Sequence, residues 1–163
     1  MSRCAKRMLA VPLVLALSLG VAARATAAPA AGLSWQVHGT GSGSASLTAV
    51  SSSGPAMPQF VGDATYSLSL SMPGTTGPNG AGGRCEVISG SGSVTAADGA
   101  MISFATVGTL CNEDGSGSPL HYNGTYRITK GDGRFSGAAG GGSLTATFDS
   151  THFIKIDGTV TGF

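Results

Sequence analysis

The chain has 163 residues, of which 41% are hydrophobic and only 10% are charged. A disordered chain would carry more charge and fewer apolar residues, and a helical bundle would expose many Glu, Lys and Arg side chains, so the composition excludes both classes. We expect one domain, because this length is typical of a single hydrophobic core.

The N-terminus has the features of a secretory signal peptide. Three basic residues precede the apolar run MLAVPLVLALSLGVAA, and small residues follow it at 25–27. A basic start, a short apolar centre and a small-residue cleavage site define such a signal. We therefore predict a signal peptide over residues 1–27, a mature domain over 28–163, a secreted or periplasmic location and no membrane span after cleavage. The alternative is a retained anchor, for which the apolar run is short.

Cleavage would change the charge of the protein. Four of its nine basic residues lie in the signal, which leaves five against eight acidic residues and a formal charge of −3. The five are scattered singly: Arg84, Arg127, Lys130, Arg134 and Lys155. Without a basic patch to neutralise phosphates, we expect no nucleic-acid partner.

The mature chain has the rhythm of short β-strands separated by turn signals. Tyr66, Leu68 and Leu70 alternate with serines, which indicates a strand with one buried face. Strand-like segments occupy 33–52, 60–72, 85–111, 121–129, 135–149 and 153–163. Seven or eight short strands at this spacing predict an all-β barrel or sandwich. An immunoglobulin-type sandwich would need a Trp between its cysteines, whereas Trp35 precedes both.

The segment between Cys85 and Cys111 predicts a hairpin closed by a disulfide. Asp98 and Gly99 form a two-residue turn signal, which would pair residues whose numbers sum to 197. The two cysteines sum to 196, so we expect a one-residue bulge at Gly90 or Gly92 to bring them opposite each other. An exported chain favours their oxidation.

The stretch ITKGDGRFSGAAGGGSLTATF, residues 128–148, is rich in glycine but does not match a nucleotide-binding loop. Ser136 stands where a dinucleotide fingerprint needs its third glycine, and the Gly-Lys-Ser/Thr ending of a P-loop is missing. We instead predict a tight connection over 130–134, followed by glycines that let a strand bend or approach another backbone closely.

The same stretch resembles the strand, turn and strand element of the allene oxide cyclase and dirigent barrel superfamily. The similarity covers residues 122–160, and the matching positions are Gly131, Gly133, Phe135, Ala138 and Gly140. Lys130 and Asp132 replace two residues of the family pattern. The resemblance implies an antiparallel eight-stranded barrel with an interior cavity, in a homodimer or homotrimer. It carries over no catalytic residue, because those of the plant enzymes lie outside the matching segment.

Candidate chemistry is sparse elsewhere. His38, His121 and His152 lie far apart in the sequence near turns or strand ends, and we interpret them as solvated rather than as metal ligands. The acidic loop at 112–115 lacks the alternating ligands of a calcium hand. No Gly-x-Ser-x-Gly elbow is present. We therefore assign no catalytic residue, metal site or cofactor.

Aromatic residues are spread over most of the predicted strands. Seven are candidates for lining a barrel cavity: Trp35, Tyr66, Phe104, Tyr122, Tyr126, Phe148 and Phe153. An eight-stranded barrel has an interior just wide enough for side chains, so we favour aromatics that fill it over an open cavity. Glu86 and Arg127 are candidate polar anchors for a ligand. Each alternates with apolar neighbours, and we expect both to be exposed.

These observations favour a secreted, non-catalytic binding or interaction protein, with a small apolar ligand as one candidate partner. The alternative is a cyclase- or dirigent-like enzyme that steers cyclisation or coupling of an apolar substrate inside the barrel. A third class, a structural component of an extracellular layer, would associate through exposed strand edges.

Overall fold

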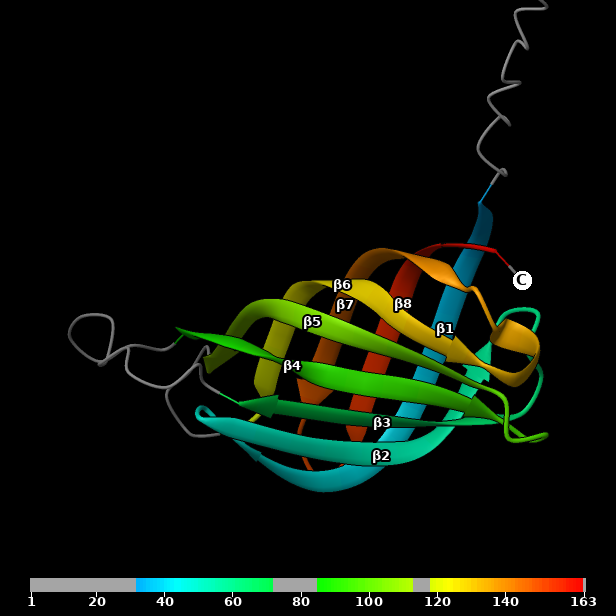
Figure 1. The fold of residues 1–163 in the computed structure, drawn as a ribbon. Coiled ribbons are helices and arrows are strands. Elements are labelled where there is room, and N and C mark those ends of the chain that lie inside the picture. The colour runs from blue at the N-terminus through cyan, green and yellow to red at the C-terminus, as the bar shows by residue number, and fades with distance from the viewer. Residues whose placement is uncertain (1–31, 72–84, 113–117, 163) are drawn as a thin grey trace, which may run out of the picture.

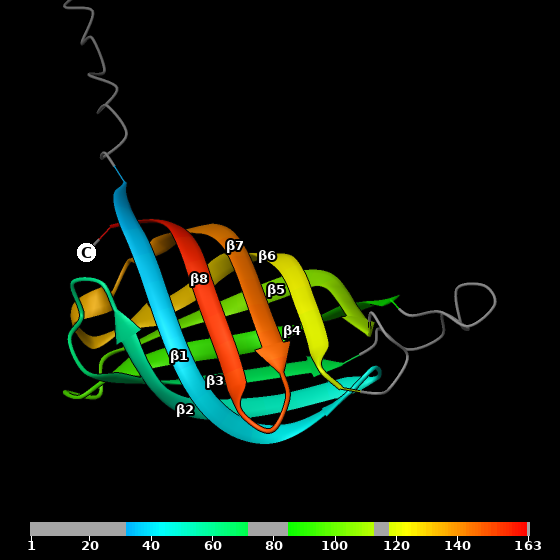
Figure 2. The same ribbon diagram turned by 180° about the vertical axis from the view of Figure 1, so that it is seen from behind.

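The computed structural model describes residues 32–71, 85–112 and 118–162. In these ranges, eight strands form a closed antiparallel barrel in which each strand pairs with the next and β8 closes onto β1 (Figures 1 and 2). The strands are β1 Leu33–Ser46, β2 Ala49–Pro58, β3 Ala64–Ser71, β4 Cys85–Ala96, β5 Met101–Asn112, β6 Leu120–Asp132, β7 Ala139–Phe148 and β8 His152–Thr161. The predicted fold class is confirmed. The signal peptide at 1–27 and residues 113–115 of the acidic loop lie outside the described residues.

Strict alternation of side chains builds the core. In β3, every second residue from Ala64 to Leu70 is buried, and the residues between them are exposed. The same period of two continues in β6, β7 and β8, so the apolar face of each strand points into the barrel. Closure leaves no unpaired edge between β1 and β8, whose register runs from Leu33 opposite Val160 to Gly41 opposite His152.

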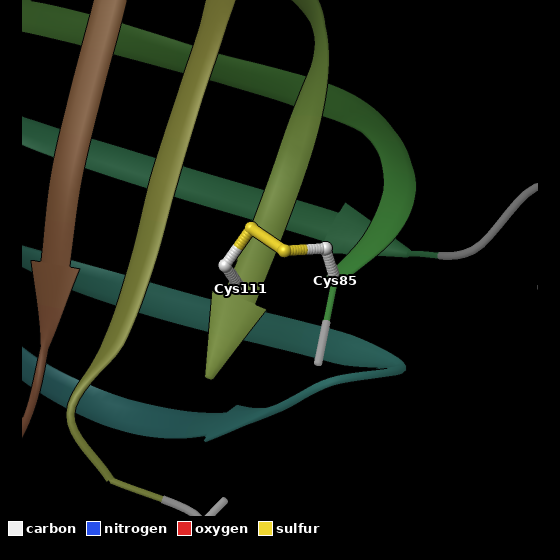
Figure 3. The surroundings of a disulfide bond; sticks show 2 residues. All are labelled: Cys85 and Cys111. Atoms are coloured by element: carbon white, nitrogen blue, oxygen red, sulfur yellow. A yellow bond between two sulfur atoms is a disulfide. The ribbon is translucent and has the colours of Figure 1, made fainter. Parts of the chain in front are cut away.

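The hairpin of β4 and β5 carries the predicted disulfide. Cys85 and Cys111 are directly opposite each other and are bonded (Figure 3). The predicted bulge is wrong, because the register from Cys85 to Thr95 is continuous. The turn instead has three residues, 97–99, closed by the Ala96 amide donating to the carbonyl of Ala100 at 2.9 Å. Gly99 takes the left-handed conformation (φ 83°) that such a turn requires, and this odd loop length shifts the pairing sum to 196.

The glycine-rich stretch is structural, but its connection is longer than predicted. β6 continues to Asp132, a single 3-10 turn follows at Gly133–Phe135, and β7 begins only at Ala139. A Cβ atom on Gly140 or Gly142 would collide with the backbone carbonyls of Thr159 and Asp157 on β8, respectively. These two glycines therefore let β7 approach β8 more closely than any other residue would allow.

Candidate functional site

Six of the seven candidate cavity residues lie inside the barrel. Trp35, Tyr66, Phe104, Tyr122, Tyr126 and Phe148 are all at most 4% exposed. The prediction that Phe153 lines the cavity is wrong, because 53% of this residue is exposed. His152, Ile154, Ile156 and Val160 on β8 all face inward, which places Phe153 on the outer surface.

The interior rings cover glycines on neighbouring strands. The Tyr66 ring occupies the space that side chains on Gly39 and Gly41 would take, and Phe104 does the same for Gly92. Phe104 also meets Tyr126 edge to face, with ring centroids 5.6 Å apart. Large rings over small residues pack a barrel interior tightly, and this arrangement agrees with aromatics that fill the barrel.

A chain of hydrogen bonds is buried inside the barrel. His152 Nδ1 lies 2.9 Å from Ser52 Oγ, which lies 2.8 Å from Tyr66 Oη. The prediction that this histidine is solvated is wrong, because it is only 3% exposed and its burial lowers its pKa. The chain joins β8, β2 and β3, and the His152 ring contacts Phe148 edge to face. Ser52 is also 3% exposed, so a substrate would have no access to this Ser-His pair.

The two candidate polar anchors lie on opposite sides of the barrel wall. Arg127 is exposed, as expected. The prediction that Glu86 is exposed is wrong, since it is only 9% exposed. Glu86 points inward like Ile88, two residues along the strand, while Val87 between them faces out. Asn112 is buried at the same end of the barrel, at the last position of β5. Glu86 and Asn112 are therefore both buried where β4 begins and β5 ends.

The tyrosines are held in their neutral form. Burial raises the pKa of Tyr66 and Tyr122, against the smaller effect of their hydrogen bonds to Ser52 and Thr106. Burial, helped by the carboxylate of Asp157, raises the pKa of Tyr126 to about 12. The Tyr126 hydroxyl and Trp35 Nε1 have no hydrogen-bond partner within the described residues. None of these phenols can act as a base near neutral pH.

Described residues form a concavity of about 950 Å³ on the outer surface of the barrel. We call it the outer groove. It crosses β2, β1, β8, β7, β6 and β5, several of which face the viewer in Figure 2. Two outward-facing rows of paired residues form most of it: Thr40, Phe153, Thr147, His121 and Cys111, then His38, Lys155, Thr145, Asn123 and Thr109.

The outer groove combines apolar anchors with polar groups. Met57 is 77% exposed and stands opposite His38, while Phe153 stands opposite Thr40. The two apolar side chains thus lie on the strands that flank β1. Lys155 is paired with Asp157 at 2.8 Å, so it adds little net charge. The arrangement offers hydroxyl, amide and imidazole groups around two exposed apolar side chains.

Sequence reasoning missed the outer groove because it sought ligands only inside the barrel. The available signal was the phase of β8: placing Ile154 and Ile156 inside puts Phe153 and Lys155 outside. Which residues of the other strands lie beside Phe153 and Lys155 depends on the register of strand pairing, which the sequence does not show. Among the described residues, no group of three or more His, Cys, Asp or Glu side chains is placed to hold a metal ion.

No family model matches the chain, and no curated protein or solved structure matches it either. The described part of the chain contains no helix with the length and apolarity needed to cross a bilayer.

Proposed function

We propose that the mature chain is an exported, non-catalytic interaction protein that binds a polypeptide partner in the outer groove. The observation that carries this proposal is the exposure of Met57 and Phe153 within one concavity of about 950 Å³. Exposed apolar residues rimmed by polar ones mark protein interfaces, where aromatic residues and Met are enriched. Met also adapts its shape to a partner at low cost.

The rest of the molecule supports a binding role. The Cys85–Cys111 disulfide fits a protein that works in an oxidising compartment. The one Ser-His hydrogen bond among the described residues is buried, and no hydrogen bond to a carboxylate orients His152 there. The exposed imidazole of His38 and the hydroxyls of the outer groove instead suit hydrogen bonding to a peptide backbone.

Photo-crosslinking tests this proposal. A benzophenone amino acid at position 153 should crosslink to one discrete polypeptide when the protein is exported by its native host together with the other secreted proteins. The same group at position 48, which is exposed in the turn between β1 and β2, is the matched control. Met57→Ser should weaken the crosslink at 153. Equal products at both positions, or none at 153, would show that the outer groove is not the interface.

A second candidate is an apolar ligand, or cyclisation or coupling of an apolar substrate, inside the barrel. It is favoured by the resemblance of residues 122–160 to the allene oxide cyclase and dirigent superfamily, and by the buried carboxyl group of Glu86. Native mass spectrometry of the mature protein distinguishes it. A small-molecule adduct that leaves on collisional activation would favour this candidate, and the same spectrum reports whether the protein is a monomer, dimer or trimer.

A further inference from the structure

A second large concavity, of about 510 Å³, lies on the outer surface of β2 to β5. These strands are on the near side of the barrel in Figure 1, whereas β1, β8 and β7 of the outer groove are on the near side in Figure 2. We call it the serine groove, after seven residues: Ser51, Ser53, Ser67, Ser69, Ser91, Ser93 and Ser103. The proposed polypeptide interface does not involve this surface.

The seven serines form two rows that run across the strands. Ser51, Ser69 and Ser91 are register partners on β2, β3 and β4. The second row is Ser53, Ser67, Ser93 and Ser103, and it extends to β5. Neighbouring strands are about 4.8 Å apart and alternate residues of one strand are about 6.7 Å apart, so the rows form a regular lattice of hydroxyl groups.

The serine groove is electrically neutral. No residue that lines it is charged. The cation nearest in register is Lys130, opposite Ser103, and its ammonium is paired with Asp132 at 2.8 Å. A phosphate or carboxylate ligand would therefore find no compensating charge in this groove.

Most of the hydroxyl groups are free to bind a ligand. Ser67 and Ser93 share a hydrogen bond of 3.0 Å, and the other five hydroxyls make none with the described residues. A hydroxyl both donates and accepts, so a lattice of them complements a surface that is itself covered with hydroxyls. Serine is also short, which lets a flat ligand approach the sheet closely.

We propose that the serine groove binds a neutral polysaccharide chain. A repeating polyhydroxyl polymer can make the same pair of contacts at each strand it crosses, and its neutrality matches that of the groove. Met101, at one edge, adds an apolar contact for a sugar face. A polypeptide would use the hydroxyl lattice poorly, because its side chains need apolar pockets for affinity.

Depletion isotherms with insoluble cellulose, chitin and β-1,3-glucan test the proposal on the mature, oxidised protein. At least one polymer should deplete the protein from solution, and high salt should not weaken the binding. The triple variant Ser53→Ala, Ser69→Ala, Ser91→Ala should bind about tenfold or more weakly, because each lost neutral hydrogen bond contributes about 0.5–1.5 kcal/mol.

The matched control removes three hydroxyls from the other side of the barrel. Ser34, Ser143 and Thr159 are exposed on β1, β7 and β8, and their triple alanine variant should bind normally. Ser69→Tyr, which fills the groove with a good strand former, should abolish binding even if the alanine variant is unstable. Phe153→Ser should leave polysaccharide binding unchanged, which separates this site from the outer groove.

Three outcomes would overturn the proposal. The first is no depletion by any of the three polymers. The second is an equal loss in the groove variant and in the control variant. The third is binding only to an anionic polymer and its loss in high salt, which would indicate an electrostatic interaction instead.

Discussion

Removal of the Cys85–Cys111 disulfide should destabilise the protein by a calculable amount. The two cysteines are 26 residues apart in the sequence. A crosslink that closes a loop of this length lowers the entropy of the unfolded chain by an amount equivalent to about 3.5 kcal/mol at 25 °C. The native state should lose little, because the backbone ladder from Glu86 opposite Leu110 onward holds the hairpin without the bond.

The assay is guanidinium denaturation of the mature protein and of the double variant Cys85→Ser, Cys111→Ser. We expect the free energy of unfolding to fall by about 3.5 kcal/mol, a large share of the roughly 5–15 kcal/mol of an ordinary domain. The melting temperature should fall by roughly 10 °C. Wild-type protein under reducing conditions is the control and should match the variant.

A loss smaller than about 1 kcal/mol would refute this reasoning, because the loop-entropy contribution would then be largely absent. A reduced wild type that stays as stable as the oxidised protein would also refute it.

Three further predictions concern the barrel itself. Gly142→Ala should lower the free energy of unfolding by about 2–3 kcal/mol, because the new methyl group would collide with the Asp157 carbonyl. Gly99→Asn should lower it by less than about 1 kcal/mol, since Asn tolerates a positive φ and no atom lies within 4 Å of the added Cβ. Equal melting temperatures of the two variants would contradict this prediction. The pKa of Tyr126 is about 12 in the folded protein, so the free energy of unfolding should decrease as the pH rises from about 10 through 12. Ultraviolet absorbance should show phenolate forming together with unfolding rather than before it. Burial lowers the pKa of His152, so the unfolded chain binds more protons and the free energy of unfolding should decrease as the pH drops below about 6.5. In urea denaturation, His152→Asn should reduce this dependence of stability on pH. An unchanged dependence would place the acid sensitivity at another residue.

Local patterns determined much of the architecture. The alternation of Tyr66, Leu68 and Leu70 with serines is a property of the strand itself, because successive side chains point to opposite faces whatever the strand pairs with. The Cys85–Cys111 pairing was predictable as well, because a hairpin is a short-range structure. The turn of this hairpin was harder to predict, since the conformation of Gly99 decides whether the loop has two or three residues.

The phase of an ambiguous strand required the tertiary structure. Glu86 lies between cysteine and valine, and only the packing of Ile88 inside the closed barrel shows that it too points inward. The first residue of a strand, such as His152, has the same ambiguity, because its phase follows from the inward Ile154. Alternation with an apolar neighbour therefore misplaced Glu86, and position near a strand end misplaced His152.

The sequence by itself determined a β-rich chain with one disulfide and strands of alternating polarity. Only the tertiary structure decided where binding surfaces form. Phe153 and Met57 share the outer groove because β8 closes onto β1, which no local pattern encodes. The serines of β2 to β5 become a lattice because the register aligns them across strands far apart in the sequence. Side-chain alternation is local, whereas register and closure are set by the packing of all eight strands described here around one core.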